Sequence, residues 1–185
     1  MKSLKEELKK INMQNLKFSI LKKDDIKAVI ELINKAYREN NPNSWTSEAH
    51  LLSGIRVNED MLNEILKNKN IVTYIALLDE KIVATIQTKL EDEDIHIGLF
   101  AVHPDFQSFG VGKKLLAFAE ESSKKLWKKS SFVMEVISNR VELRDYYIRR
   151  GYQNTNSFIE FPKSSYWSPL TNEELKLLVL RKNID

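Results

Sequence analysis

The stretch at residues 97–116 constrains the fold more than any other, because it predicts a strand, a tight turn and a helix in direct succession. The strand-forming run that begins at Ile97 stops before Pro104, which has no amide hydrogen for a sheet ladder. Apolar residues at helical spacing follow Lys113. The turn between them holds Gly110 and Gly112, two of only five glycines in the chain. Such a turn is either an ordinary helix start or a site where free amides bind a phosphate group.

The residue types that are missing exclude several classes of site. The 185 residues include no cysteine, which excludes a disulfide framework, a thiolate zinc site and a cysteine nucleophile. The three histidines, at positions 50, 96 and 103, do not follow metal-ligand spacing, and no G-x-S-x-G motif occurs. We therefore expect no metal site, and the sequence does not favour a hydrolase or a metalloenzyme.

The distribution of charge argues against an extended polyanion as the partner. The formal net charge is +3, and lysines are interleaved with glutamates instead of forming one basic block. This pattern is typical of a solvated surface, so a nucleic-acid-binding module is the weaker alternative. The N-terminus lacks the apolar core of a signal peptide, and no segment approaches the roughly 20 apolar residues that span a bilayer. We therefore expect a cytoplasmic protein with neither nucleic acid nor membrane as a partner.

Hydrophobic periodicity predicts an alternation of strands and helices. Residues 1–15 are expected to form a short N-terminal helical extension, and residues 16–185 a single domain. Within that domain we expect strands at 16–21, 71–78, 81–90, 95–102, 131–137, 155–161 and 174–180, and helices at 26–37, 59–66, 113–127 and 140–150.

The same periodicity predicts which side chains point inward. Both faces of the strand at 95–102 are largely apolar, which predicts a central strand, and a period of two places four residues on one face: Ile95, Ile97, Leu99 and Ala101. In the helix at 140–150 the expected inward residues are Val141, Leu143, Tyr147 and Ile148. Gly151 is expected to end that helix in the left-handed conformation.

Two motifs in the sequence resemble those of a known family. Val102-His103-Pro104 is followed by Gln107-x-x-Gly110-x-Gly112 and a helix, and the segment 136–152 contains Asn139 and ends in Tyr147-x-x-x-Gly151-Tyr152. Their order and separation resemble motifs A and B of the GNAT superfamily of N-acetyltransferases. The resemblance implies an α/β GNAT (acyl-CoA N-acyltransferase) fold, with a mixed, mostly antiparallel central sheet flanked by helices.

The resemblance also implies acetyl-coenzyme A as the acyl donor. Its diphosphate would lie on the glycine turn, and its pantetheine arm would enter a gap between the strand ending at Val102 and the strand ending near Ile137. Backbone groups of 100–102 would pair with the arm, and the amide of Phe100 or Ala101 would polarise the thioester. The expected cofactor-binding residues are Phe100, Ala101, Val102, Gln107, Ser108, Phe109, Gly110, Val111, Gly112, Lys113, Asn139 and Tyr146.

Acetyl transfer to an amine needs two proton movements, which the resemblance assigns in part. Tyr147 matches the family's general acid, although a tyrosine there can also be a core aromatic with a satisfied hydroxyl. The attacking amine must lose a proton, because a free lysine amine has a pKa of about 10.4. Glu48 and His96 are the candidate bases, and a chain of water molecules would also serve.

The segment 45–56 is dense in reactive side chains and resembles the acceptor-side region of one group of GNAT proteins. The structural alternative makes Trp45 a core lid and Thr46 a helix cap. We expect the acceptor to be an amine-bearing small molecule or peptide. The aromatic segment around Tyr166 and Trp167 could form a homodimer contact. The alternative function is a non-catalytic acyl-CoA-binding sensor or assembly subunit with the same fold.

Overall fold

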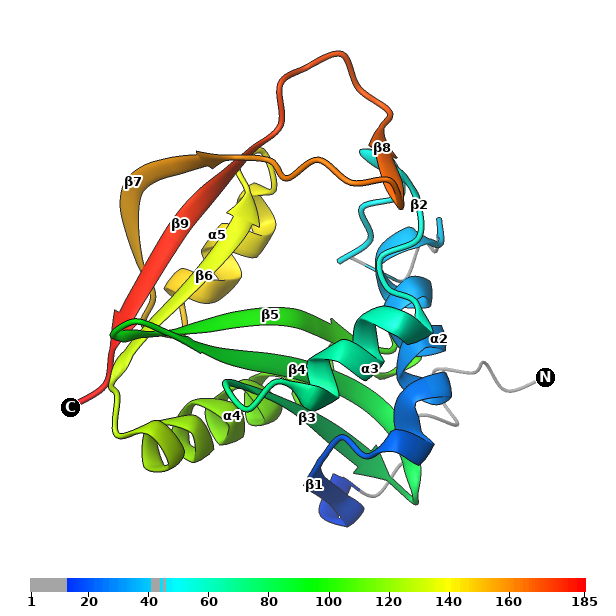
Figure 1. Cartoon of the computed structure of the whole chain (residues 1–185), viewed down its shortest axis with the longest axis vertical. Helices are drawn as coiled ribbons and strands as arrows, with labels where there is room; N and C mark the ends of the chain where they lie inside the picture. Colours follow the sequence, from blue (N-terminus) through cyan, green and yellow to red (C-terminus); the bar gives the residue numbers. More distant parts are fainter. Residues whose placement is uncertain (1–12, 41–43, 45) are drawn as a thin grey trace.

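The computed structural model describes residues 13–40, 44 and 46–185. A seven-stranded sheet in the order β1-β3-β4-β5-β6-β9-β7 forms the centre, and β2 and β8 make a separate two-stranded sheet (Figure 1). β5 and β6 are parallel, whereas the other neighbours in the described part of the large sheet are antiparallel. The predicted fold class is therefore confirmed. Most of the expected N-terminal extension lies outside the described residues.

The helices and longer strands follow the sequence predictions closely, because each carries its own periodic signal. Their bounds are β1 Leu16–Ile20, α2 Ile26–Arg38, β2 Leu52–Gly54, α3 Glu59–Lys67, β3 Ile71–Leu78, β4 Lys81–Glu91, β5 Asp94–Val102, α4 Val111–Trp127, β6 Ser131–Ile137, α5 Val141–Ile148, β7 Gln153–Glu160, β8 Trp167–Pro169 and β9 Lys176–Asn183. The short strands β2 and β8 were not predicted. They pair with each other across more than a hundred residues, which no local pattern reveals.

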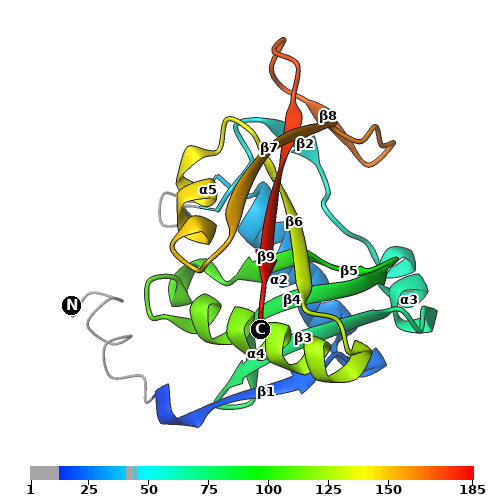
Figure 2. The same cartoon turned by 90° about the vertical axis from the view of Figure 1, so that its left-hand side faces the viewer.

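Helices cover both faces of the large sheet. α4 packs on one face through Leu115 and Leu116, in a core cluster that also contains Phe132 and Tyr147. α2 and α3 pack on the other face, in a cluster that includes Ile33 and Leu62. Figure 2 shows α4 in front of the sheet and α2 behind it. Each described helix falls short of the length and apolar content needed to cross a membrane.

A β-bulge in β5 corrects the predicted alternation of its side chains. Leu99 has a φ of 42°, and the register with β4 shifts at this point. Ile95 and Ile97 lie in the core cluster beneath α4, as expected. After the bulge the faces exchange, so Leu99 and Ala101 lie in the cluster beneath α2. The prediction that these four residues share one face is wrong because one extra residue inverts the period of two. The central position of the strand is confirmed.

β5 and β6 separate soon after they begin. They pair over only four positions, from Asp94 opposite Ser131 to Ile97 opposite Met134. β6 continues beside β9 up to Ile137. Figure 1 shows the two parallel strands diverging from a shared starting edge. Within the described residues, the edge of β5 after Ile97 therefore pairs with no strand on the side that faces β6.

α5 is short and ends as the sequence predicts. Gly151 has a φ of +92°, and Tyr152 N–H donates to the Tyr147 carbonyl at 3.2 Å, which is the hydrogen bond of a Schellman motif. Tyr147 is buried, but Val141 and Ile148 are 46% and 43% exposed, so the prediction that they point inward is wrong. An eight-residue helix on the rim of the sheet has only a narrow buried stripe.

Candidate active site

The turn before α4 presents unpaired amides on an open concave surface. Ser108 and Gly110 both have positive φ values, 72° and 80°. The first helical hydrogen bond runs from Lys114 N to Gly110 O at 3.1 Å, so the amides of residues 111–113 precede any intrahelical acceptor. A Cβ built on Gly110 would meet no atom within 4 Å. Backbone of this kind, at the positive end of a helix dipole, binds anions.

A cavity of about 310 Å³ lies beside this turn and is lined in part by cationic side chains. Its residues are Thr46, Val102, Phe106, Gln107, Ser108, Gly110, Gly112, Lys113, Tyr146 and Arg150. The Arg150 guanidinium lies 3.2 Å from the centre of the Tyr146 ring and donates to the Tyr146 carbonyl at 2.6 Å. Lys113 is exposed at the cavity rim. The positive charges of Lys113 and Arg150 and the free amides at the N-terminus of α4 are complementary to the negative charge of a diphosphate. The sequence analysis missed Arg150, which follows a helix end and carries no motif signal.

Gly112 is closely packed against its neighbours. A Cβ at this position would lie 3.2 Å from the Tyr146 hydroxyl and 3.2 Å from Val102 Cγ2. The first turn of α4 therefore sits directly against the end of β5 and against α5. Gly112 and Val102 from the first sequence motif and Tyr146 from the second therefore meet in one wall of the cavity.

Four residues of the expected cofactor set lie away from this cavity or have structural contacts. The buried Gln107 side chain donates to the Val102 carbonyl at 3.0 Å and to Thr46 Oγ1 at 3.1 Å, so it ties the 44–46 segment to β5. Thr46 lies in a turn and caps no helix. Phe109 and Val111 pack in or against the core. Asn139 is exposed and does not line the cavities described here.

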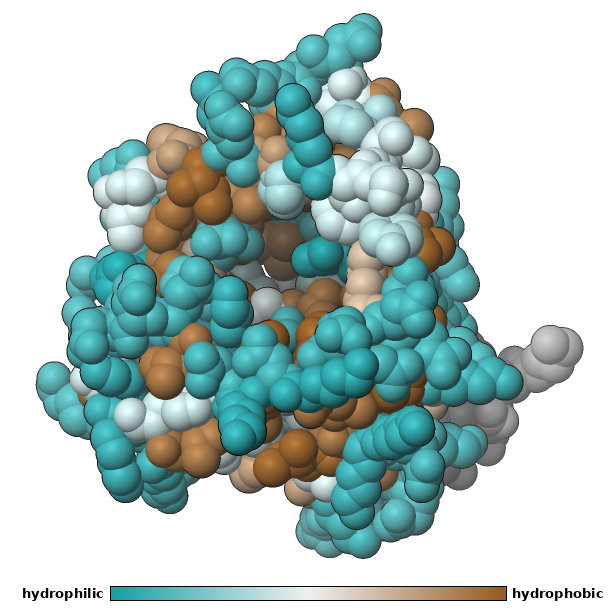
Figure 3. Space-filling model, in the orientation of Figure 1, coloured by the Kyte–Doolittle hydropathy of each residue, from teal (hydrophilic) through white to brown (hydrophobic). Residues whose placement is uncertain are grey.

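A second cavity, of about 210 Å³, occupies the gap between β5 and β6. Figure 3 shows it as a hollow in the face of the molecule. A narrow space of about 40 Å³ lies between the two cavities and shares lining residues with each: Phe100 and Tyr147 with the gap cavity, and Val102 and Tyr146 with the cavity beside the glycine turn. The three spaces therefore lie in succession along one route, from the glycine turn, past the end of β5, to the gap between the strands.

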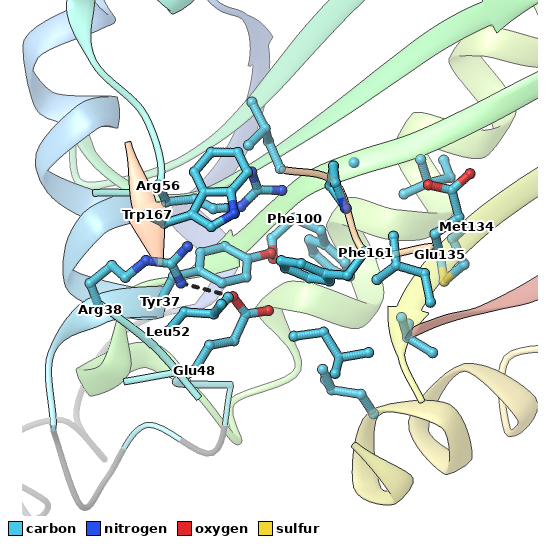
Figure 4. Close-up of a pocket in the computed structure, with 18 of the residues that line it drawn as sticks. Tyr37, Arg38, Glu48, Leu52, Arg56, Phe100, Met134, Glu135, Phe161 and Trp167 are labelled. Atoms are coloured by element: carbon cyan, nitrogen blue, oxygen red, sulfur yellow. Dashed lines mark hydrogen bonds and ion pairs between the residues drawn. The ribbon is translucent and has the colours of Figure 1, made fainter. Parts of the chain in front are cut away.

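The wall of this gap cavity comes from four distant parts of the chain. Figure 4 shows Tyr37 between two pairs of side chains, with Arg38 and Glu48 on one side and Arg56 and Trp167 on the other. Arg38 Nη1 lies 2.8 Å from Glu48 Oε2, and both side chains are buried. Arg56 belongs to the 45–56 segment that the sequence placed on the acceptor side, whereas Tyr37 and Arg38, at the end of α2, were not expected in the site because no local pattern shows which cavity a helix end reaches. Trp167, expected at a dimer contact, lines this cavity, whereas Tyr166 is 42% exposed.

The carbonyls at the free edge of β5 are already engaged. Tyr37 O–H donates to the Phe100 carbonyl at 2.8 Å, and the Val102 carbonyl accepts from Gln107. On the other edge, His103 N donates to Val83 O of β4 at 2.8 Å. Because every second residue of an antiparallel strand bonds to the same neighbour, Ala101, opposite Thr85, is also bonded to β4. The amide of Val102, between them, points toward the gap. N–H groups are the backbone groups left for a ligand at this edge.

Tyr147 contributes a neutral hydroxyl to the wall. Its side chain is 8% exposed and lines both the gap cavity and the connecting space. Burial, with a smaller effect from Tyr37, raises the pKa of Tyr147 well above 10. Within the described residues its hydroxyl has no hydrogen-bond partner. A phenol in this state has a proton to donate.

The two candidate bases lie in different places. Glu48 lines the gap cavity beside Tyr37. His96 is outside the cavity wall, with Nδ1 3.8 Å from Glu135 Oε1. Across residues 13–40, 44 and 46–185, no three His, Asp or Glu side chains are arranged to hold a metal ion.

We expect Tyr37 to make the free energy of unfolding depend on alkaline pH. Burial and Glu48 raise its pKa from 10.0 to about 12 in the folded chain. This stabilisation is complete below pH 10 and is lost as pH rises toward 12. Between pH 9 and 11, the free energy of unfolding measured by denaturant titration should fall by roughly 1 kcal/mol more for the unmodified chain than for Tyr37→Phe. Equal losses would contradict this role of the Tyr37 hydroxyl.

Gly54 should control how the C-terminal segment closes the gap cavity. It has a φ of +90°, and a Cβ there would lie 2.1 Å from the Tyr166 carbonyl, next to Trp167. We expect Gly54→Ala to cost about 1–3 kcal/mol of stability through backbone strain. It should also raise the KM for the amine while leaving the affinity for coenzyme A unchanged. An unchanged amine KM would show that this segment does not shape the acceptor side.

The comparisons with known proteins agree with this geometry. A sequence model described as an acetyltransferase (GNAT) domain matches residues 34–166, more than half of the chain. No curated protein sequence matches. Similar solved structures include the ribosomal-protein-S18-alanine N-acetyltransferase from Escherichia coli, with a TM-score of 0.67, 15% identity and coverage of 92% of this chain and 94% of that one.

Two further structures share the fold. An N-acetyltransferase from Staphylococcus aureus Mu50 has a TM-score of 0.69 and 15% identity, covering 91% of this chain and 97% of that one. The paia N-acetyltransferase from Thermoplasma acidophilum, solved in complex with coenzyme A, has a TM-score of 0.66 and 17% identity, covering 91% and 99%. The chain thus belongs to the GNAT acetyltransferase family and is an acetyl-coenzyme A-dependent N-acetyltransferase.

Proposed function

We propose that the chain moves an acetyl group from acetyl-coenzyme A to a primary amine by direct attack, with the amine bound in the gap cavity. One observation carries the proposal: three spaces lie in succession from the glycine turn to the gap between β5 and β6, and Tyr147 lines the second and the third. Acetyl-coenzyme A supplies an activated acetyl group at the end of a long arm.

The proposed binding roles follow the charges along this route. The amides of residues 111–113, with Lys113 and Arg150, hold the diphosphate. Gly110 and Gly112 keep side chains out of the turn. Tyr146, on the wall shared by the first cavity and the connecting space, contacts the pantetheine arm. Phe100 and Val102 offer N–H groups from the edge of β5 that faces the gap to the same arm.

The backbone of Phe100 is proposed to polarise the thioester. Ala101 is bonded to β4, so Phe100 is the better of the two amides considered from the sequence. Tyr37 fixes this residue by donating to its carbonyl. A preorganised N–H aimed at an oxygen that gains negative charge is among the stronger catalytic devices, because it needs no rearrangement during the reaction.

Tyr147 and Glu48 are proposed to move the two protons. The Glu48 carboxylate takes the proton that the attacking ammonium must lose, and Arg38 holds that carboxylate in the cavity wall. The amine lone pair forms the new C–N bond as the C–S bond breaks, and the nitrogen, now part of the amide, releases its second proton to solvent. Tyr147 gives its own proton to the departing thiolate and recovers one from solvent, so that the protons balance.

The experiment is release of free thiol from acetyl-coenzyme A in the presence of a panel of primary amines, with mass spectrometry of the products. We expect thiol release that depends on one class of amine and yields the N-acetylated product. Tight binding of acetyl-coenzyme A with no release for any amine would contradict the proposal and favour a non-catalytic acyl-CoA-binding subunit.

A further inference from the structure

Arg56 is a cation held inside the gap cavity without a carboxylate partner among the described residues. Its guanidinium lies 5.7 Å from the ring centres of both Tyr37 and Trp167. Its backbone is fixed as well, because the Arg56 amide donates to Asn34 Oδ1 at 2.7 Å. A guanidinium positioned between two aromatic rings keeps its planar N–H groups available in a fixed direction.

The other charges near Tyr37 cancel in pairs. Arg38 is bonded to Glu48, and Arg140 is bonded to Glu142. Arg56 is the cation left over in the described part of this wall. Glu135 also lines the cavity, but it belongs to β6, across the cavity from Arg56 in Figure 4, and faces His96.

The same wall has a surplus of hydrogen-bond donors. Trp167 Nε1 and Arg38 Nε are both buried, and neither has an acceptor within residues 13–40, 44 and 46–185. Buried N–H groups are nearly always paired, so these two show that the residues of this wall are short of hydrogen-bond acceptors. Arg56 adds a positive charge at the same place. A carboxylate meets both requirements.

We infer that the acetyl acceptor is a free α-amino acid, bound through its carboxylate by Arg56 and Trp167 and through its ammonium group by Glu48. Glu48 and Arg56 flank Tyr37 on opposite sides (Figure 4), which suits a ligand that carries its ammonium and carboxylate groups on one carbon atom. The apolar part of the cavity, at Leu52, Phe161 and Leu177, receives the side chain. This inference rests on the proposed function.

The test compares each of a panel of L-amino acids with its own α-amide, which mimics a peptide N-terminus. We expect kcat/KM for the acid to exceed that for the amide by about 10- to 100-fold, as for a hydrogen bond to a charged group. Intrinsic reactivity works in the opposite direction, because the amide has the less basic amine and hence more of it unprotonated. An amide that reacts as well as its acid would overturn the inference.

Arg56→Gln supplies the second arm. Its kcat/KM should fall by the same 10- to 100-fold with the amino acid but only about twofold with the amide. Arg56→Lys should recover part of the kcat/KM lost with the amino acid. Lys69→Gln, which removes one exposed charge from a distant loop, is the matched control and should change neither. Equal losses of Arg56→Gln on acid and amide would overturn the assignment.

Calorimetry with coenzyme A present separates this inference from the proposed function. If an amino acid binds and the Arg56→Gln substitution weakens that binding, the inference is supported even where no thiol is released. In that outcome only the proposed function fails. Thiol release without preference for the acid overturns the inference alone. Absence of both binding and turnover with every amino acid also overturns it.

Discussion

Gly112→Glu is expected to abolish binding of coenzyme A, with an affinity loss of about 100-fold or more. The new carboxylate would stand among the amides of the glycine turn, where a diphosphate is proposed to bind, and like charges placed together cost several kcal/mol. It would also enter a space where even a Cβ lies 3.2 Å from the Tyr146 hydroxyl. Isothermal titration calorimetry with coenzyme A measures the effect.

Gly112→Gln is the matched control, because it has nearly the same size and shape without the charge. Both variants push against Val102 and Tyr146, so any loss from crowding is shared. We expect the glutamine variant to bind at least about tenfold more tightly than the glutamate variant, as charge repulsion requires. Similar affinities in two folded variants, checked by thermal unfolding, would mean that the turn does not hold the diphosphate.

Tyr147→Phe is expected to lower kcat by about 100- to 10,000-fold, the usual range for loss of a general acid. Its affinity for coenzyme A should stay the same, because the ring remains packed in the core beside Phe100 and Tyr152. Stopped-flow thiol release measures kcat, and calorimetry measures binding. Tyr166→Phe, at an exposed ring, is the control and should leave kcat within about twofold.

The pH profile of kcat adds a second readout for Tyr147. Its pKa is raised well above 10 by burial, so the hydroxyl stays protonated through neutral and mildly alkaline pH. We therefore expect no alkaline decline in kcat from this residue below pH 10. A Tyr147→Phe variant with normal turnover would leave Tyr147 as a core aromatic with no part in proton transfer.

The parts of the site that lie close together in sequence were predictable. The strand, the glycine turn and α4 follow one another within residues 97–116, so their order alone places the free amides at the end of a central strand. The end of α5 was predictable for the same reason, because Gly151 supplies the left-handed residue of the cap. In both places local backbone chemistry determines the geometry.

The parts built by long-range pairing were not predictable. The bulge in β5 places a leucine, Leu99, at positive φ, and nothing in the neighbouring sequence predicts a bulge there. Arg56 and Trp167 meet only because β2 pairs with β8, far away in the chain. Periodicity reports which face of an element is apolar, but it does not report which elements share a cavity wall.

Binding of the acetyl-coenzyme A diphosphate at the glycine turn is the central proposal, and a crystal structure of the complex tests it directly. We predict diphosphate oxygens about 3 Å from the amides of residues 111–113, with the pantetheine arm between the edge of β5 and the end of β6. A diphosphate bound away from the glycine turn, or β5 and β6 paired along their whole length in the complex, would contradict it.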